Sequence, residues 1–232
     1  MRYLALTHNE NTSWAESATD VSIGGRRPFG YEVISEMDSL GMLIDLAHTS
    51  RSTALASIRA SGAPAVMTHS SCRGLVDHPR NVDDETMRAL ADAGGVLMLT
   101  FVPPFISVER ADWDAELRRK AVACGKDPRN LDVLRELEKE QELPPPKATL
   151  FPAIEHLEYA REIVGVDSIG LAGDYDGMSD VPLELEDVSC YPTIFAALLE
   201  HGWSVTECTK LAGQNTLRVL HEVESVAKSL TR

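Results

Sequence analysis

The stretch Met42–His69, MLIDLAHTSRSTALASIRASGAPAVMTH, decides the fold class. It opens with the apolar run Met42–His48 (MLIDLAH) and closes with the second apolar run Ala65–His69 (AVMTH), and each run predicts a short strand. Between the runs, the segment Ser52–Ala60 predicts a helix. A strand, a helix and a strand in this order are typical of two parallel strands joined by a crossover helix.

The same alternation extends in both directions along the chain. Further strands are predicted at Arg2–His8, Val96–Val102 and Ile169–Asp174, and further helices at Phe29–Leu40 and Asp83–Ala93. The first of these helices should have an apolar face of Phe29, Val33, Ile34, Met37 and Leu40, with Pro28 near its start and Gly41 past its end. Two or three more helices should finish the chain. The sequence therefore predicts an α/β fold with a parallel sheet.

Two α/β architectures fit this alternation: a doubly wound sheet and a (β/α)₈ barrel. No G-x-G-x-x-G pattern follows any strand and no Walker pattern occurs, so the usual signature of a nucleotide site on a doubly wound sheet is missing. The charged region 107–147, which ends in Pro144-Pro145-Pro146, is interpreted as two surface helices inserted in a single domain spanning residues 1–232. Its run Leu131–Glu142 is predicted to be a solvated helical face.

Composition excludes several classes of function. The chain has 232 residues, and its formal charge is 22 − 36 = −14, which argues against nucleic-acid binding and against docking to anionic membranes. No apolar run of 18 residues and no signal peptide are found, so no membrane association is expected. The four cysteines form no C-x-x-C pair and are expected to be free thiols in a reducing compartment.

Polar residues suited to catalysis stand where the predicted strands end. Four of the five strands end in His8, His48, His69 or Asp174. In a barrel the carboxyl ends of the strands form the active-site face. Alternation supports this placement, because three sets of residues should each share one strand face: Ile44, Leu46 and His48; Ala65, Met67 and His69; Gly170, Ala172 and Asp174.

A histidine alone at a strand end is more often a structural hydrogen-bonding group than a ligand, but three at equivalent positions favour a site. Imidazoles and carboxylates together are a ligand set for Zn²⁺ or a similar divalent ion. Arg80, in the loop after the His69 strand, fits two interpretations equally: a grip on a substrate carboxylate, or a surface residue next to the following helix. The remaining histidines are interpreted as surface or packing residues: His78, His156, His201 and His221.

Five segments together resemble the membrane (renal) dipeptidase family, zinc-dependent peptidases of the amidohydrolase-like barrel superfamily. They are RYLALTHNENTSWAES (Arg2–Ser17), GMLIDLAHTS (Gly41–Ser50), THSSCRGLVDHPRNV (Thr68–Val82), GLAGDYDG (Gly170–Gly177) and LEDVSCYP (Leu185–Pro192). The resemblance covers nearly the whole chain. The insertion at 107–147 resembles that of bacterial members, which implies a cytoplasmic protein.

The resemblance implies a role for each candidate residue. His48 and His69 match the two histidines that hold the second zinc of a two-zinc centre. Asp174 matches the aspartate that moves the proton, and His8 matches the histidine that contacts the substrate and the developing oxyanion. Arg80 matches the arginine that binds the substrate's C-terminal carboxylate. The implied activity is hydrolysis of dipeptides by metal-activated water.

One departure from the family limits this expectation. The family's H-x-D metal motif and its bridging glutamate lie upstream of the matching segments, and no H-x-D occurs in these residues. The fold expected is therefore a partial (β/α)₈ barrel, N-terminally truncated, with about five of eight strands and two open sheet edges. Three explanations stay open: an internal start, a truncated gene, or a site completed by a partner chain or a homodimer.

Three functions are compatible with the sequence. The first is a metal-dependent dipeptidase. The second is a catalytically inactive barrel fragment that lacks the first zinc's ligands. The third is a different metal-dependent amidohydrolase on the same barrel, against which Arg80 argues because a carboxylate anchor suits the C-terminus of a peptide.

Overall fold

A five-stranded parallel sheet forms the centre of the computed structural model, which describes residues 1–22, 24 and 27–230. Its strands are β1 (Tyr3–Ala5), β2 (Leu43–Asp45), β3 (Val66–Ser70), β4 (Val96–Leu99) and β5 (Ile169–Leu171). Each strand pairs in parallel with the next one along the chain. A doubly wound sheet reverses its strand order at a switch point, whereas consecutive barrel strands do not. The predicted α/β class is confirmed, with the strand order of a barrel segment.

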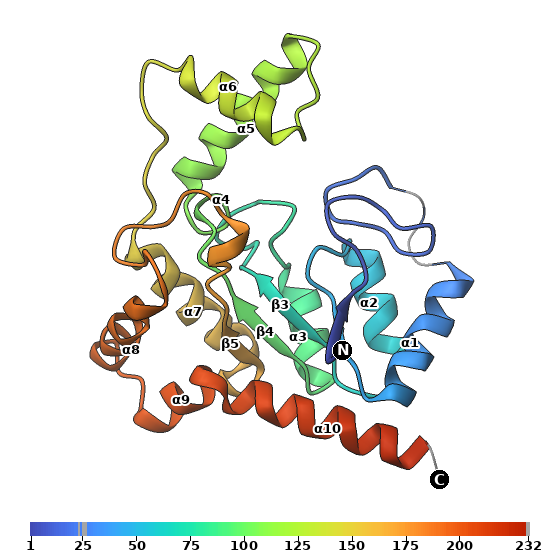
Figure 1. The fold of residues 1–232 in the computed structure, drawn as a ribbon. Helices are drawn as coiled ribbons and strands as arrows, with labels where there is room; N and C mark the ends of the chain where they lie inside the picture. Colours follow the sequence, from blue (N-terminus) through green and yellow to red (C-terminus); the bar gives the residue numbers. More distant parts are fainter. Residues whose placement is uncertain (23, 25–26, 231–232) are drawn as a thin grey trace.

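The helices that connect the strands form a layer along the sheet (Figure 1). They are α1 (Pro28–Leu40), α2 (Arg51–Ala60), α3 (Asp84–Asp92) and α7 (Leu150–Val164). Local sequence sets their ends. Ser50 and Asp83 accept hydrogen bonds from the backbone N–H groups of Thr53 and Thr86 as N-caps, and Gly41 ends α1 with a φ of 67°.

The chain ends in three helices, of which the last covers the amino ends of the strands. They are α8 (Tyr191–Glu200), α9 (Val205–Thr209) and α10 (Asn215–Leu230), with a wide helical turn at Lys210–Gln214. Val219 and Val223 of α10 pack in one cluster with Leu43, Val66 and Val96 from three strands. Because α10 closes this end, only the carboxyl ends of the strands are left to form a site.

A helical hairpin projects beyond the carboxyl ends of the strands (Figure 1). It follows the short helix α4 (Pro103–Ile106) and consists of α5 (Val108–Ala123) and α6 (Leu131–Lys139). The two predicted helices of the insertion are confirmed. The charged residues of α6 are mostly exposed, as predicted, and its other face is buried, because Leu134 and Leu137 pack against Leu117 and Ala121 of α5. Short 3₁₀ turns occur elsewhere at Val166–Ser168, Tyr175–Gly177 and Val188–Cys190.

Two expectations about apolar surfaces need correction. In α1, Ile34 and Met37 are buried as predicted, but Phe29 and Leu40 are exposed, because they lie at the helix ends and Phe29 contacts Trp14 instead of the sheet. The two outer strands also differ from each other. Tyr3 and Leu4 of β1 are exposed, as expected for an open edge.

In the described part of the chain, strand β5 lacks a second strand partner, as expected, but its first residue is covered. The Asn215 side-chain amide, at the start of α10, donates hydrogen bonds to the carbonyl oxygens of Val166 and Ile169, at 2.7 and 2.8 Å. Ile169 is fully buried. Among the described residues both outer strands thus lack a second strand partner, and β1 is the more exposed of the two. Within that part of the chain, no helix is long and apolar enough to cross a bilayer.

Candidate active site

The five candidate residues all lie at the carboxyl ends of the strands. His8, His48 and Asp174 each stand three positions after the last residue of a strand, namely Ala5, Asp45 and Leu171. His69 is the fourth of the five residues of β3, and Arg80 follows in the next loop. The structure therefore brings together the residues that the sequence singles out.

The alternation argument for this placement was wrong for two of the three strands. Strand β2 ends at Asp45 and β5 ends at Leu171, so His48 and Asp174 lie beyond the pleated segments. Their backbones are left-handed, with φ of 67° at His48 and 59° at Asp174. Among the described residues the only other non-glycine residue with positive φ is Glu184. A left-handed backbone at such residues costs about 1–3 kcal/mol and concentrates at functional sites.

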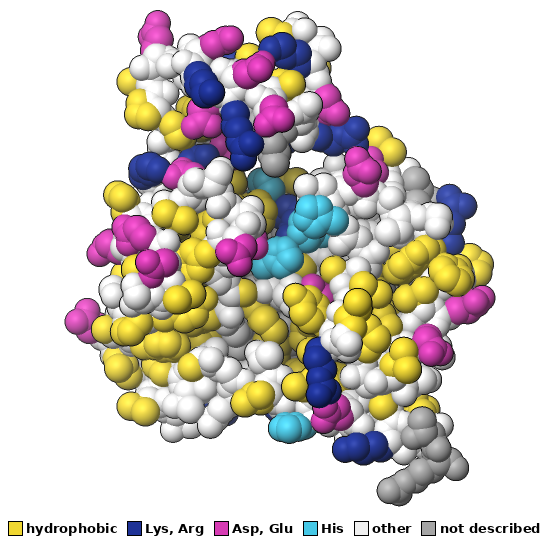
Figure 2. Space-filling model, in the orientation of Figure 1, with side chains coloured by type: hydrophobic (Ala, Val, Ile, Leu, Met, Phe, Trp, Pro, Cys, Tyr) yellow, Lys and Arg dark blue, Asp and Glu magenta, His cyan; other side chains and the backbone are white. Residues whose placement is uncertain are grey.

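Three histidine rings form a continuous row. The ring centroids of His8 and His48 are 4.2 Å apart, and those of His48 and His69 are 4.9 Å apart. The Nε2 atoms of His48 and His69 face each other at 2.9 Å. In Figure 2, histidine side chains line a hollow below the α5–α6 hairpin. The row thus presents imidazole nitrogens to an accessible space.

Burial keeps two of these rings uncharged. Desolvation and, second to it, the positive charge of Arg80 lower the pKa of His48 from its ordinary 6.5 to about 2. The pKa of His69 is also lowered, chiefly by desolvation and then by Arg80, while Asp174 and Asp45 act in the opposite direction. Both rings are therefore neutral at pH 7, which is the form in which imidazole binds metal ions.

Arg80 is a buried cation with few partners. Its side chain is 5% exposed and lies over the Phe105 ring at 5.4 Å. One hydrogen bond runs from its Nη2 to the His69 carbonyl oxygen at 3.2 Å. Among the described residues no carboxylate forms a salt bridge with it, and burial lowers the pKa of Arg80 to about 10. Most of its five donors are thus available to an incoming anion.

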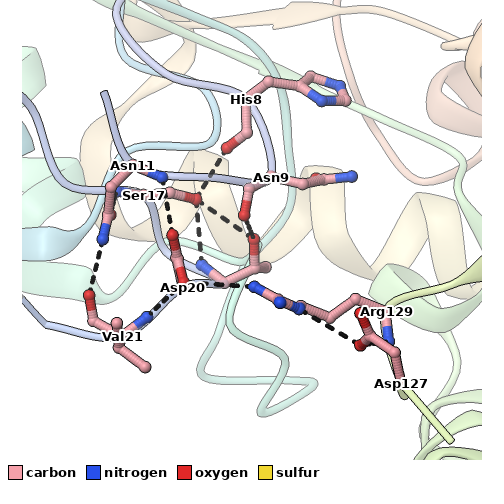
Figure 3. Close-up of polar contacts among 9 residues, drawn as sticks. His8, Asn9, Asn11, Ser17, Asp20, Val21, Asp127 and Arg129 are labelled. Atoms are coloured by element: carbon pink, nitrogen blue, oxygen red, sulfur yellow. Dashed lines mark hydrogen bonds and ion pairs between the residues drawn. The ribbon is translucent and has the colours of Figure 1, made fainter. Parts of the chain in front are cut away.

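The loop that carries His8 is held by its own polar groups and by the helical hairpin (Figure 3). The Ser17 hydroxyl donates to the His8 carbonyl oxygen at 2.7 Å. The Asp20 carboxylate accepts a hydrogen bond from the Asn11 backbone N–H at 2.9 Å and pairs with Arg129, in the α5–α6 connection, at 3.4 Å. The hairpin is therefore tied to the side of the site where His8 stands.

The other histidines occupy packing or surface positions, as the sequence predicts. His156 is buried and its Nδ1 accepts the Cys72 backbone N–H, while His201 and His221 are exposed. His78 stacks on Phe105, and its Nδ1 accepts the Arg80 backbone N–H at 3.2 Å. His78 therefore helps to position the Arg80 loop.

Two polar residues that support the site were missed by the sequence reasoning. Asp45 is 1% exposed, and its carboxylate accepts the hydroxyl hydrogen of Thr68, the residue before His69. The Thr68 hydroxyl also meets the Nδ1 of His69 at 2.8 Å. The sequence did contain a sign of this role. Asp45 is the one charged residue in the otherwise apolar run Met42–Ala47, and a buried carboxylate requires hydrogen-bonding partners.

The donor set fits one divalent ion in part. Two neutral imidazole nitrogens converge at His48 and His69, but the described residues contain no group of three or more His, Cys, Asp or Glu side chains able to hold a metal ion. A catalytic zinc site usually has three protein ligands. The residues present therefore match two ligand positions of one ion and do not match a two-metal centre.

The family model described as membrane dipeptidase (peptidase family M19) matches residues 1–232. The chain belongs to the membrane dipeptidase family. An uncharacterized dipeptidase of Schizosaccharomyces pombe is 35% identical over 233 residues, which cover 99% of this chain and 48% of that protein. The resemblance read from the sequence motifs is thus confirmed.

Solved structures of dipeptidases share the fold. The probable dipeptidase PvdM from Pseudomonas aeruginosa superimposes with a TM-score of 0.86 at 25% identity, over 97% of this chain and 63% of that one. A metallo peptidase from Rhodobacter sphaeroides, liganded with a phosphinate mimic of the dipeptide L-Ala-D-Ala, has a TM-score of 0.74 at 21% identity, over 96% of this chain and 56% of that one. The chain spans about half the length of the curated dipeptidase that it matches.

Proposed function

We propose that this chain carries the substrate-anchoring part and two metal ligands of a dipeptidase site. The single observation that supports this most is the buried Arg80 guanidinium, which lies beside the His48–His69 pair with no salt bridge among the described residues. Membership of the dipeptidase family gives the reaction class. The substrate class is a dipeptide with a free carboxylate, such as L-Ala-D-Ala.

Arg80 anchors the substrate in this proposal. A guanidinium offers parallel N–H donors that match the two oxygens of a carboxylate. The surrounding site excludes water from the cation, since Phe105 and the backbone of His69 cover it. A dipeptide held by its C-terminus at Arg80 places its peptide bond toward the histidine row.

His8 and Asp174 act at the peptide bond. His8 is exposed at the end of the histidine row and donates a hydrogen bond to the oxygen on which negative charge develops. Asp174 lies close enough that its charge acts to raise the pKa values of His69 and Arg80. In this proposal it takes a proton from the attacking water and passes that proton to the leaving amine.

His48 and His69 would hold a divalent ion, for which Zn²⁺ is the candidate. When bound, such an ion supplies an activated water and polarises the carbonyl group. The remaining ligands would have to come from groups outside the described residues, for example from a second copy of the chain or from another chain. A cytoplasmic location is part of the same proposal, favoured by four cysteines without a C-x-x-C pair.

A second candidate function is a metal-binding relative without hydrolytic activity. One observation favours it: no three-ligand metal group is formed by the part of the chain that the structure describes. The two candidates agree on dipeptide binding at Arg80 and on ion binding at His48 and His69, and they differ only in turnover.

The test compares L-Ala-D-Ala with its C-terminal amide on the 232-residue chain supplied with Zn²⁺. Calorimetry should show the free dipeptide binding about 10- to 100-fold more tightly than the amide, and Arg80→Ala should remove this difference. The exposed Arg88→Ala serves as a matched control that leaves the difference unchanged. Equal binding of acid and amide by the wild type would contradict the anchoring role. Turnover then separates the dipeptidase from the inactive relative.

A further inference from the structure

A chain of three hydrogen-bonded side chains runs from the interior of the sheet to the histidine pair. The Asp45 carboxylate is 1% exposed, and its Oδ1 accepts the backbone N–H groups of Ala47 and Thr68, at 2.9 and 3.0 Å. Its Oδ2 accepts the Thr68 hydroxyl at 2.7 Å. The same hydroxyl oxygen lies 2.8 Å from the Nδ1 of His69. Asp45 is thus fully engaged by donors from its own strand end and from β3.

The number of hydrogens available to Asp45, Thr68 and His69 allows only one arrangement of these hydrogen bonds. A threonine hydroxyl has a single hydrogen, and here the carboxylate of Asp45 accepts it. The hydroxyl oxygen can then only accept at its contact with His69, so Nδ1 of His69 must carry a hydrogen. A neutral imidazole has one N–H, and its other nitrogen is therefore a bare lone pair.

We propose that Asp45 and Thr68 are positioning residues that fix the tautomer of His69, so that its Nε2 always presents a lone pair toward His48 and the site. The inference deepens the proposed function, because a lone pair at Nε2 is what a divalent ion requires. Supporting groups of this kind orient metal-binding histidines and set their tautomer. In this proposal Asp45 and Thr68 act only through His69, so neither is a catalytic residue.

His48 is not fixed in the same way. Its Nε2 faces the lone pair of His69 at 2.9 Å, which makes it the donor of that hydrogen bond in the metal-free chain. Its Nδ1 is buried and has no hydrogen-bond partner among the described residues. The two histidines therefore differ: His69 keeps one tautomer, whereas His48 would have to change tautomer if an ion took the place of the shared hydrogen.

The test reads the tautomer directly, without any assay of hydrolysis. Long-range ¹H–¹⁵N correlation spectra of the ¹⁵N-histidine-labelled chain distinguish a protonated from an unprotonated ring nitrogen, and His69→Gln assigns the signal. The wild type should show Nδ1–H and a bare Nε2 at His69. Thr68→Ser keeps the hydroxyl and should keep this pattern, whereas Thr68→Val should give a mixture of tautomers.

Asp45→Asn provides a sharper version of the same test. The amide oxygen keeps the two backbone N–H bonds, so the NH₂ group replaces Oδ2 and donates to the Thr68 hydroxyl. That hydroxyl then turns its hydrogen to Nδ1 of His69, and the tautomer reverses to Nε2–H. If Asp45→Asn does not fold, the Thr68→Val and Thr68→Ser pair still decides the question.

Zn²⁺ titration by calorimetry gives the second readout. Thr68→Val should weaken binding about 10- to 100-fold, and Thr68→Ser should restore it. Thr100→Val is the matched control, since it removes a buried hydroxyl after the neighbouring strand β4 that has no partner among the described residues. A wild-type His69 with Nε2–H, or the same tautomer in Thr68→Val, overturns the inference. A fixed tautomer without Zn²⁺ binding supports it and counts against the proposed function instead.

Discussion

The Nε2 atoms of His48 and His69 lie 2.9 Å apart, although the two residues come from different strand ends. Two imidazole lone pairs repel at this distance unless a hydrogen or a cation lies between them. The two nitrogens would therefore be the groups that hold a divalent ion when one is bound, and a hydrogen shared between them fills that place otherwise.

The first prediction concerns this pair. The chain should bind one Zn²⁺, and either His48→Ala or His69→Ala should weaken binding at least about 100-fold, because a single remaining imidazole is a poor ligand set. His201→Ala, which removes an exposed histidine on another surface, is the control and should leave affinity unchanged. Two tightly bound ions per chain, or unaltered binding in both site variants, would show that the ligands lie elsewhere.

The second prediction tests the proton-carrying role of Asp174. Asp174→Asn keeps the size and the hydrogen-bonding oxygen of the side chain but removes its basicity. Dipeptide turnover should fall about 10²- to 10⁴-fold, while the melting temperature should change little, since the side chain is only partly buried. Retained turnover in the Asp174→Asn variant would exclude a role for Asp174 in proton transfer.

The third prediction uses the close approach of Gly177 to Asp174. A Cβ added at Gly177 would lie 2.4 Å from the Oδ1 of Asp174, so Gly177→Ala must displace the carboxylate. Turnover should fall about 100-fold, the effect of misplacing a reacting group by about 1 Å. In Gly62→Ala the nearest atom would be 3.8 Å from the added Cβ, and this control should retain activity. Equal activity of the two variants would contradict the placement of Asp174.

The fourth prediction concerns acid stability and His156. Burial lowers the pKa of His156 from its ordinary 6.5 to about 4 in the folded chain. Below pH 6.5 the unfolded chain takes up the proton first, so folding stability is present above 6.5 and is lost as the pH falls toward 4. The loss from this one residue is about 3 kcal/mol over that window.

His156→Asn preserves an acceptor for the Cys72 backbone N–H but cannot be protonated. Urea unfolding at pH 7.5 and pH 5 should show a smaller loss of stability at low pH in this variant than in the wild type. His221→Asn, at an exposed position of α10, should behave as the wild type. An unchanged pH dependence in His156→Asn would mean that other groups cause the acid sensitivity.

The fifth prediction separates the two partners that tie the hairpin to the His8 loop. Arg129→Ala removes two exposed ion pairs, those with Asp20 and Asp127, and should lower the free energy of unfolding by less than about 1 kcal/mol. Asp20→Ala also removes the hydrogen bonds from the backbone N–H groups of Asn11 and Val21, and should cost about 1–2 kcal/mol. If urea unfolding gave the same loss of unfolding free energy for both variants, the ion pairs of Arg129, and not the hydrogen bonds within the loop, would be the main stabilising contacts.

The order of strands and helices was predictable from sequence because its signals are local. Apolar runs marked the strands, and the caps at Ser50, Asp83 and Gly41 lie where the chain's own pattern changes. Strand lengths were overestimated, since an apolar residue next to a strand, such as Leu46, can be buried without joining the ladder.

The sequence indicated which residues form the candidate site, but not how they are arranged in space. His8, His48, His69 and Asp174 stood out as polar residues after apolar runs. The left-handed turns at His48 and Asp174 depend on contacts from other segments, such as the hydrogen bond from the Ala18 backbone N–H to the His48 carbonyl oxygen. The link from Asp45 to Thr68 joins two strands, and no pattern along one strand reveals it.

The packing of α10 has a consequence for the time at which the chain can fold during synthesis. Val219 and Val223 complete the cluster formed with Leu43, Val66 and Val96, and α10 also packs against α1. Residues 43–96 and residues 215–230 thus share one core. The strands β2, β3 and β4 leave the ribosome before α10 and must wait, with their amino ends uncovered, until residues 215–230 emerge, so native packing of this core is completed only after translation of that helix.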